Sequence, residues 1–572
     1  SFWLKLTLAQ RIQATACIGI AMGHVPFLVA LAAFSAGHCE EVHTTVVIIG
    51  GGAAGVAAAD ILNTSHVDFL LLEARDQLGG RMQETTFGGF TVELGANWIH
   101  GIHTKDGMEN NPLWDYKKEF KMKGNFTDYE DIDFLNRMGG KFDRWNTQKW
   151  WNRVESAMEF CEEKSEELWN KSDDENIKPP ESIDISVRKC FEEYGYMKPW
   201  MQYYQKKIAK TVEWAEIDFE FAQPAEDVST MGGFPANGDY AHKDFLITDQ
   251  RGYATILRTI AQNFSASVRL SQTVTSVEYS DESVTVKTRD GLTVRAKYAI
   301  CTLPLGVMKQ RTVKFTPPFN KRKMAGIDGM AMGRYAKVYL QFVSNFWDKK
   351  WGKAREILLT GGKPVGWMTW ALNLDHPKYA PGSKILSYHF VDDFAKQVES
   401  QPVEVTKAHI MKSLRQQFGS TIEEPLKILV TNWTHNPLTF GSYSNWPIGY
   451  TTPEWEEMVK NEGHLYFAGE HLDELFGYVH GALNSGQSVA SSIAEELSRG
   501  PKLLRKFSND PPAFGQHSSV DRQQWRQHHV RRLLFLIVGL SLVGSATAFA
   551  CRLGSRHWQP ANQCTPILSS EE

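Results

Sequence analysis

The stretch from Val46 to Arg81 constrains the fold more than any other part of the chain. It reads VVIIGGGAAGVAAADILNTSHVDFLLLEARDQLGGR, which is a short apolar strand, a glycine turn, an alanine-rich helix and a second apolar strand that ends in an acid. Gly50, Gly52 and Gly55 match G-x-G-x-x-G, whose glycines allow a tight turn and close approach of a pyrophosphate to the backbone. Free N–H groups at the start of the helix would face the phosphates. The order of these parts predicts a βαβ unit that binds a dinucleotide.

The acid at the end of the second strand narrows the choice of nucleotide. Glu73 follows the apolar run 69–72, where its carboxylate can accept hydrogen bonds from an adenosine ribose and would repel a 2′-phosphate. NADP is therefore disfavoured. Gly79 and Gly80 leave backbone space beside Arg81, whose guanidinium suits phosphate oxygens. A glycine-rich turn without a ligand and a solvated loop arginine are the alternatives.

Composition and charge exclude several classes of function. The chain has 572 residues, of which 42% are hydrophobic and 22% charged, and this predicts two or more globular domains with ample core. The net charge of −4 argues against nucleic acid as a partner and is compatible with a cationic substrate. The seven cysteines show no CxxC or metal-ligand spacing, so the sequence indicates neither a metal site nor a disulfide scaffold.

The first part of the chain carries a signal for secretion. Met22 begins an apolar stretch, 22–37, that ends in small residues as a signal peptide does, and we expect translation to start there. A buried or amphipathic helix over 18–37 is the alternative. N-x-S/T sequons fit a secreted glycoprotein. They lie at Asn63, Asn125, Asn170, Asn263 and Asn432.

The last part of the chain carries a signal for a membrane. The uncharged apolar run 533–550 is just long enough to cross a hydrocarbon core, and it predicts a C-terminal transmembrane helix. A cleaved signal peptide would place Arg531 and Arg532 on the non-cytoplasmic side, against the positive-inside tendency. We expect a membrane-anchored protein of the secretory pathway or cell surface. A tail-anchored protein with a cytosolic catalytic domain is the alternative.

Two distant motifs give the chain its resemblance to the flavin amine oxidases. Glu73 to Arg81 resembles the E-A-x-x-x-x-G-G-R stretch of that family, in which the acid holds the adenosine ribose and the arginine meets the pyrophosphate. Residues 465–490 contain FAGEH and GYVHGALNSG, which resemble the closing flavin motif of the polyamine oxidases. The resemblance implies that Glu470 meets the ribityl–phosphate portion, Val479 offers its backbone near the isoalloxazine, and Tyr478 flanks the amine.

The resemblance implies a noncovalently bound FAD. Monoamine oxidases attach FAD through a cysteine in the closing motif, whereas no cysteine lies between Cys301 and Cys551 here. The loop GANWIHG, 95–101, resembles the loop that passes the flavin, and Val274 falls where a backbone contact to adenine is expected. The implied cofactor-binding residues are Gly50, Gly52, Ala53, Ala54, Gly55, Glu73, Arg81, Gly95, Ala96, Asn97, Trp98, Val274, Trp446, Gly469, Glu470, Tyr478 and Val479.

A lysine in an apolar strand is the main catalytic candidate. Residues 333–340, GRYAKVYL, resemble the strand that carries the family lysine, here Lys337, with Tyr335 on the same face by the period of two. Burial should depress the pKa of Lys337, so that it could hold a water at flavin N5 for reoxidation or imine hydrolysis. A lysine that snorkels from a strand edge is the alternative.

Aromatic and charged residues complete the predicted substrate site. Residues 440–447 resemble the loop that brings a tryptophan, Trp446, against the flavin, and Glu220 matches a tunnel carboxylate that attracts distal ammonium groups. His100 stands where plant apoplastic polyamine oxidases carry glutamate, and it could bond an amine or acetamide end. This departure leaves the side of the nitrogen that is cleaved open. The predicted catalytic residues are Lys337, Tyr335, Trp446 and Tyr478, and the predicted substrate-binding residues are His100, Glu220 and Tyr478.

The resemblance spans about 46–499 and implies an α/β fold. We expect an FAD-binding Rossmann-like domain of the glutathione-reductase and amine-oxidase type, interleaved with an α+β substrate domain that carries a mixed sheet, and a C-terminal transmembrane helix. The expected bounds are a leader at 1–41, an FAD-binding domain at 42–117, 241–330 and 448–500, a substrate domain at 118–240 and 331–447, a linker at 501–530, a transmembrane helix at 531–552 and a tail at 553–572.

The function implied is that of a polyamine oxidase. Spermine, spermidine or an N-acetylated form would be oxidised at a secondary amine, with hydride transfer to flavin N5 and reoxidation by O2. The products would be H2O2, an aminoaldehyde and a shorter amine. We expect a monomer that binds polyamine and O2 but no nucleic acid. An oxidase of another primary or monoamine, or a flavoprotein ectodomain without catalytic activity, is the alternative.

Overall fold

The computed structural model describes residues 40–102, 111–127, 132–172, 183–233, 243–352, 354–360 and 365–499. From Glu41 onwards, these ranges belong to one compact unit. The predicted signal peptide, linker, transmembrane helix and tail lie outside the described residues.

One sheet is built around the predicted βαβ unit. Its central strand β1 (Glu41–Ile49) pairs in parallel with β2 (Phe69–Leu72) on one side and with β12 (Thr293–Cys301) on the other. Strand β1 is buried on both faces along 46–49, as the continuous apolar run predicts for a parallel sheet. The remaining strands are β9 (Val268–Arg269), β10 (Val274–Tyr279), β11 (Val284–Thr288), β13 (Lys314–Thr316) and β21 (Leu465–Phe467).

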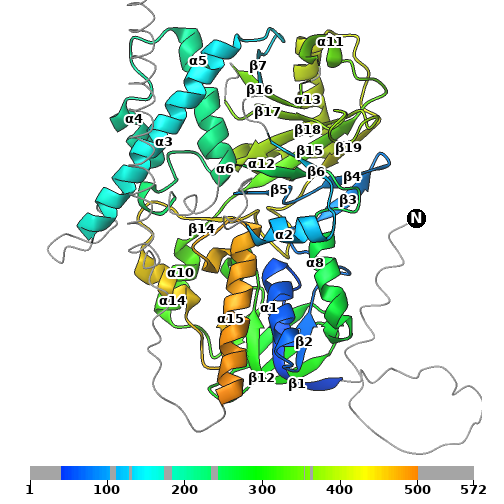
Figure 1. The fold of residues 1–572 in the computed structure, drawn as a ribbon, viewed down its shortest axis with the longest axis vertical. Helices are drawn as coiled ribbons and strands as arrows, with labels where there is room; N and C mark the ends of the chain where they lie inside the picture. Colours follow the sequence, from blue (N-terminus) through cyan, green and yellow to red (C-terminus); the bar gives the residue numbers. More distant parts are fainter. Residues whose placement is uncertain are drawn as a thin grey trace, which may run out of the picture. The chain divides into compact units, whose positions relative to one another are not determined.

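Helices cover both faces of this first sheet. Val46 and Ile48 pack toward α1 (Ala53–Thr64) and α15 (Val479–Arg499), which lie side by side in Figure 1. Val47 and Ile49 point into a second core, which also holds residues of α10 (Lys321–Gly329) and α14 (Thr452–Val459). Because successive side chains of a strand point to opposite faces of the sheet, the apolar side chains of β1 are divided between two cores.

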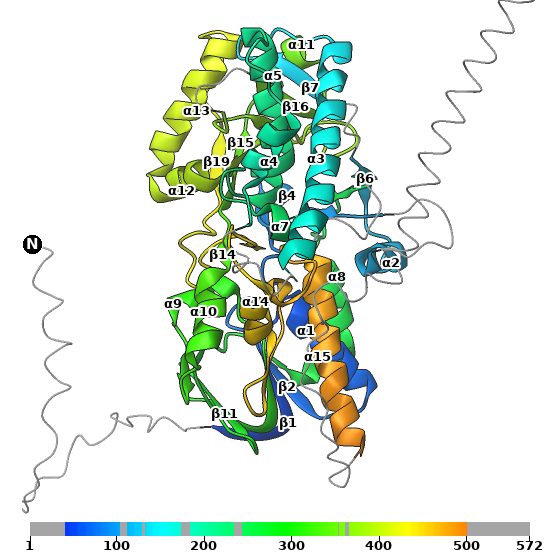
Figure 2. The ribbon, with the colours of Figure 1, turned by 90° about the vertical axis from the view of Figure 1, so that its left-hand side faces the viewer.

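The second sheet is mixed, with the strand order β19-β15-β18-β17-β16-β7. Only β7 and β16 run in parallel; the other neighbouring pairs are antiparallel. Figure 2 shows α3 and α5 on one side of this sheet and α12 and α13 on the other. The strands are β7 (Asp133–Asn136), β15 (Tyr335–Gln341), β16 (Glu356–Thr360), β17 (Trp370–Asn373), β18 (Ile385–Val391) and β19 (Lys427–Val430). The helices are α3 (Arg144–Ser172), α5 (Tyr203–Glu213), α12 (Asp392–Ser400) and α13 (Val403–Phe418).

The chain crosses repeatedly between the two sheets. Segments 41–72, 268–316 and 465–467 form the first sheet, whereas 133–136 and 335–430 form the second. A small sheet, in which β8 (Phe245–Ile247) lies between β5 (Trp98–Ile99) and β6 (Gly124–Phe126), joins parts of the chain that are distant in sequence. This architecture agrees with the predicted interleaved α/β fold with a mixed sheet, while the domain bounds stay a prediction.

The predicted fold class is corrected in one respect. It included a transmembrane helix at 531–552, yet none of the helices within the described ranges is both long and apolar enough to cross a membrane. The longest described helix, α3, buries one face in the core and carries charged residues along its length. Residues 531–552 themselves lie outside the described ranges. The structure therefore supports the α/β fold for the described ranges.

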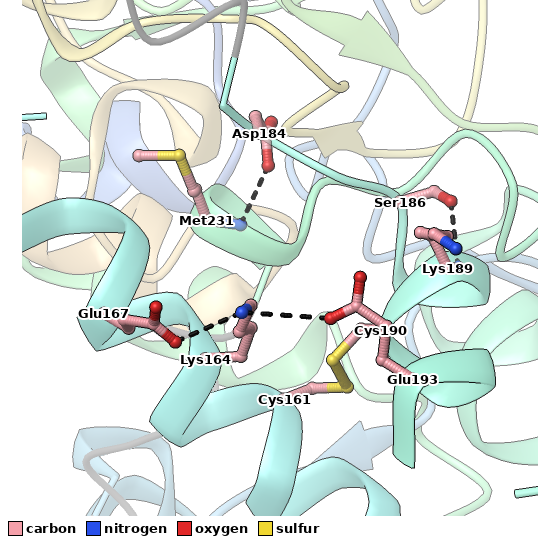
Figure 3. The surroundings of a disulfide bond; sticks show 9 residues. All are labelled: Cys161, Lys164, Glu167, Asp184, Ser186, Lys189, Cys190, Glu193 and Met231. Carbon is pink, nitrogen blue, oxygen red and sulfur yellow. Dashed lines mark hydrogen bonds and ion pairs between the residues drawn. A yellow bond between two sulfur atoms is a disulfide. The ribbon is translucent and has the colours of Figure 1, made fainter. Parts of the chain in front are cut away.

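A disulfide between two helices was not predicted. Cys161 of α3 and Cys190 of α4 (Val187–Tyr194) are bonded, with their Cα atoms 5.9 Å apart (Figure 3). Both cysteines are buried, and Lys164 forms ion pairs with Glu167 and Glu193 beside them. The spacing of these cysteines matches no short motif, so only the packing of α3 on α4 reveals the pair. The bond ties two helices of one core together.

Candidate active site

The glycine turn forms a cradle of bare backbone between β1 and α1. Gly50 has φ +110°, a conformation that side chains rarely adopt, and a Cβ on Gly55 would overlap the Gly50 carbonyl oxygen. Helix α1 starts directly after Gly52, so its first N–H groups face the end of the strand. This arrangement fits a diphosphate, because the turn has no side chain to exclude one and the helix start favours negative charge.

Glu73 is tied to the same turn. Its Oε2 accepts a hydrogen bond from Gly51 N at 2.6 Å, and its Oε1 accepts one from Arg75 N at 2.8 Å. Burial raises the pKa of Glu73, and the two backbone donors oppose that shift. The structure therefore places Glu73, the residue predicted to bind the ribose, at the glycine turn. The bond to the ribose itself stays a prediction.

Arg81 and Glu470, which are far apart in sequence, form a partly buried ion pair. Arg81 Nη1 lies 2.7 Å from Glu470 Oε1 and donates a second bond to Ser442 O at 3.0 Å. The other oxygen of Glu470 accepts from Ser444 Oγ at 2.5 Å and from Gly477 N at 2.8 Å. Burial alone would raise the pKa of Glu470, but the charges of Arg81 and His471 and the hydrogen bond from Ser444 lower it to about 2. The carboxylate is therefore ionised and holds three separate loops together.

The GANW loop leads from Arg81 to the lysine. Ala96 N donates to Arg81 O at 3.2 Å, and a Cβ on Gly95 would overlap that same oxygen. Asn97 is buried and points its Oδ1 at Lys337 Nζ. Trp98 begins β5, and its Nε1 donates to Thr127 Oγ1 at 3.0 Å. The loop is thus fixed at both ends, as a loop that lines a cofactor must be.

Lys337 is buried in the middle of β15, with only 2% of the residue exposed. Its Nζ donates to Glu93 O at 3.0 Å, to Gly95 O and to Asn97 Oδ1. Burial lowers the pKa of Lys337, while the Glu93 carboxyl opposes this shift. This agrees with the predicted depressed pKa and excludes the snorkelling alternative. The water that Lys337 would hold stays a prediction.

A buried histidine that the sequence did not indicate lies beside this lysine. His389 of β18 is the cross-strand partner of Lys337, and its Nδ1 lies 2.8 Å from Tyr335 Oη. Its Nε2 lies 3.0 Å from Ser387 Oγ, and Phe219 stacks on its ring at 5.9 Å. Burial and the charge of Lys337 hold the pKa of His389 well below its usual range. A neutral imidazole therefore orients Tyr335.

Glu220 connects two tyrosines of the site. Tyr478 Oη donates to Glu220 Oε1 at 2.7 Å, and Tyr443 Oη donates to Glu220 O at 2.9 Å. The Tyr443 ring also lies 6.2 Å from the ring of Tyr335. The structure thus brings together the predicted Tyr335, Glu220 and Tyr478, and it adds Tyr443.

Trp446 occupies a different place from the one that its proposed role implies. It is fully buried in the core between the first sheet and α14, where Nε1 donates to Tyr450 O at 2.7 Å and the ring packs against Phe476. Tyr443 is the aromatic residue of the same loop that contacts Glu220 and Tyr335. In the sequence, the only sign of this role is that Tyr443 lies in the same loop, three residues before Trp446.

His100 pairs with an acid that was also missed. His100 Nδ1 lies 3.2 Å from Asp244 Oδ1, and its ring meets the Tyr478 ring at 5.1 Å. Ala53 and Ala54 begin α1, Val274 begins β10, Gly469 precedes Glu470, and Val479 begins α15, and their contacts with the cofactor stay predictions.

Comparison with known proteins identifies the family. A profile described as "Flavin containing amine oxidoreductase" matches residues 53–494, which is most of the chain. The chain belongs to the flavin-containing amine oxidoreductases. FAD is accordingly its cofactor, and the glycine cradle, Glu73, Arg81 and Glu470 are the residues that fit it.

Proteins similar to this chain are named as polyamine oxidases or putrescine oxidase. The amine oxidoreductase is 30% identical to "Polyamine oxidase 1" of Zea mays over 78% of this chain and 90% of that protein. It is 29% identical to "Polyamine oxidase 6" of Oryza sativa subsp. japonica, again over 78% and 90%. A solved structure of putrescine oxidase bound to putrescine covers 80% of this chain and 100% of its own, with a TM-score of 0.63 at 18% identity, and supports the fold.

Proposed function

We propose that this amine oxidoreductase oxidises polyamines. The observation that carries the proposal is the pair of acids at the aromatic site: Glu220 accepts a hydrogen bond from Tyr478, and Asp244 lies beside His100. Burial, together with repulsion by Glu220, Glu155 and Asp244, raises the pKa of the nearby Glu216 to about 8, so these acids act on one another. A chain with several ammonium groups would relieve that repulsion. The names of the similar plant proteins support the same substrate class.

The side chains have distinct tasks in this reaction. The chemistry that bound FAD would supply is acceptance of a hydride from the carbon beside nitrogen, with O2 as the final acceptor of the two electrons and H2O2 as the product. Tyr443 and Tyr478 offer aromatic faces that attract cationic groups, while Glu220 can hold a distal ammonium group. Lys337 can exchange a proton at Nζ more readily than an exposed lysine, because burial lowers its pKa.

Product analysis tests the proposed function. Purified protein is mixed with spermine, spermidine, their N-acetylated forms, putrescine or a monoamine such as benzylamine, and H2O2 and amines are measured. We expect an aminoaldehyde and a shorter amine from at least one polyamine, and their masses identify the side of the nitrogen that is cleaved. Oxidation of the monoamine alone would favour the alternative substrate class, and no H2O2 from any amine would favour a flavoprotein without oxidase activity.

Glu220→Gln is expected to weaken polyamine binding selectively. Hydrogen bonds to charged groups contribute about 1.5–3 kcal/mol. Because about 1.4 kcal/mol is a factor of ten, KM for spermine should rise by roughly tenfold or more. KM for a small monoamine should rise less, because such an amine lacks a distal ammonium group. Steady-state kinetics with both amines measure the difference.

Glu282→Gln is the matched control, because this exposed acid lies in the turn between β10 and β11, away from the site. It should leave both KM values unchanged. Equal increases in KM for spermine and for the small amine in Glu220→Gln would contradict the ammonium-binding role.

We propose that the protein folds in an oxidising compartment of the secretory route. The bond between Cys161 and Cys190 supports this, since disulfides persist in such compartments and are rare where thiols are kept reduced. Peptide mapping of the natural protein under non-reducing conditions tests the proposal. A peptide that contains both cysteines is expected, and two free thiols would contradict it.

A further inference from the structure

Strand pairing places an acid directly beside His100. In the antiparallel pair of β5 and β8, Trp98 lies opposite Leu246 and Ile99 lies opposite Phe245. Continuing this register by one residue brings His100 opposite Asp244. Asp244 Oδ1 lies 3.2 Å from His100 Nδ1 and also accepts a hydrogen bond from Gly101 N at 3.3 Å. The backbone of the GANW loop therefore determines which ring nitrogen faces the acid.

His100 also borders the substrate site. Its ring meets the edge of Tyr478, whose hydroxyl donates to Glu220. The side chain of His100 is 32% exposed, while that of Asp244 is 15% exposed, so the ring can reach a ligand and the acid lies deeper. Asn111 Nδ2 donates to His100 O at 2.9 Å and lies 3.0 Å from His480 Nδ1, which restrains the loop on its other side.

We propose that Asp244 is a positioning residue that keeps His100 protonated and presents its Nε2–H to an acceptor atom of the amine substrate. This proposal rests on the proposed polyamine function. An imidazolium repels an ammonium group, so the group that it binds has to be a neutral amine or an acceptor oxygen. Distal ammonium groups are left to Glu216 and Glu220. Asp244 thereby separates the part of the site that binds acceptors from the part that binds cations.

The groups that face His100 have opposite effects on its charge. Burial alone would lower the pKa of His100, but Asp244 at the start of β8 and Glu220 of α6 (Phe219–Phe221) raise it to about 9. His480 of α15 stays neutral, because burial and the charge of His100 lower its pKa to about 3. His100 is therefore charged at neutral pH and loses its proton as the pH rises through about 9.

Asp244→Asn tests the role, because it keeps the size of the side chain and removes its charge. The pH at which kcat/KM for spermine changes with the ionisation of His100 should fall by about one unit or more, the usual effect of losing an opposite charge at this distance. In a His100→Gln background, the same substitution should produce no such shift. Asp281→Asn, in the exposed turn after β10, is the control and should behave like the wild type.

Thermal unfolding gives a second measurement that does not need turnover. The folded-state pKa of His100 is raised, so its pairing stabilises the wild type fully below the ordinary histidine pKa of 6.5, and this stabilisation is lost as the pH rises through about 9. Asp244→Asn should flatten the fall in Tm over this range.

A profile of kcat/KM and of Tm that matches the wild type, or the same shift in the His100→Gln background, would overturn the proposal. Absence of polyamine oxidation in the wild type would instead refute the proposed function, while the Tm curves would still decide the role of Asp244.

Discussion

Replacing Lys337 with methionine is expected to lower kcat by on the order of 10²-fold or more, the usual contribution of a positioned proton-transfer group. Methionine fills a similar volume but offers no proton and no donor to Glu93 O, Gly95 O or Asn97 Oδ1. These acceptors belong to Glu93 and to the GANW loop that follows it, so the lysine also fixes that loop. Turnover at saturating spermine and the absorbance of bound FAD should be measured together, and FAD should remain bound.

Lys323→Met is the matched control, because it shows how much stability and turnover are lost when a buried lysine outside the site is removed. Lys323 is 1% exposed, and its Nζ donates to Glu457 O and Met458 O at the end of α14, in a different core from Lys337. Burial lowers its pKa to about 8, so the two lysines have comparable surroundings. Both variants should lose thermal stability, but only Lys337→Met should lose turnover. Unchanged kcat in Lys337→Met, or an equal loss in Lys323→Met, would remove the proposed role of Lys337.

The βαβ unit could be predicted from sequence because its determinants are local. A continuous apolar run forms a strand buried on both faces, and Gly50 and Gly55 occupy positions where a side chain would be strained or would overlap the backbone. The burial of Lys337 followed from the apolar strand around it. Each of these features depends on residues within a few positions of one another.

The missed residues depend on pairings that a single sequence does not show. His389 meets Lys337 only through the register of β15 with β18, and Asp244 meets His100 only through that of β5 with β8. Tyr443 and Trp446 lie in one loop, and only the packing of Trp446 in the core shows that Tyr443 is the aromatic residue that contacts Glu220. The disulfide likewise depends on the packing of two helices.

Arg81→Ala is expected to release FAD. The substitution removes the charge that keeps the buried Glu470 carboxylate ionised, and loss of one partner from a buried ion pair costs about 3–5 kcal/mol. Glu470 would then be a buried carboxylate without its cationic partner, and its bonds to Ser444 and Gly477 would weaken as its pKa rose. The dissociation constant of FAD, measured by fluorescence after removal and readdition of the cofactor, should rise by on the order of 10²-fold.

Arg311→Ala is the matched control, since Arg311 forms an ion pair with Asp328 at 2.6 Å in which both side chains are about half exposed. Exposed pairs contribute about 0–1 kcal/mol, so this variant should bind FAD as the wild type does. A further substitution decides whether the unpaired carboxylate is the cause. Glu470→Gln in the Arg81→Ala background removes that charge and should recover part of the affinity, because the amide can still accept bonds from Ser444 and Gly477. If Arg81→Ala alone retained wild-type affinity, the ion pair would have no role in holding the cofactor; if the double variant recovered none of the loss, the contact of Arg81 with the diphosphate would account for all of it.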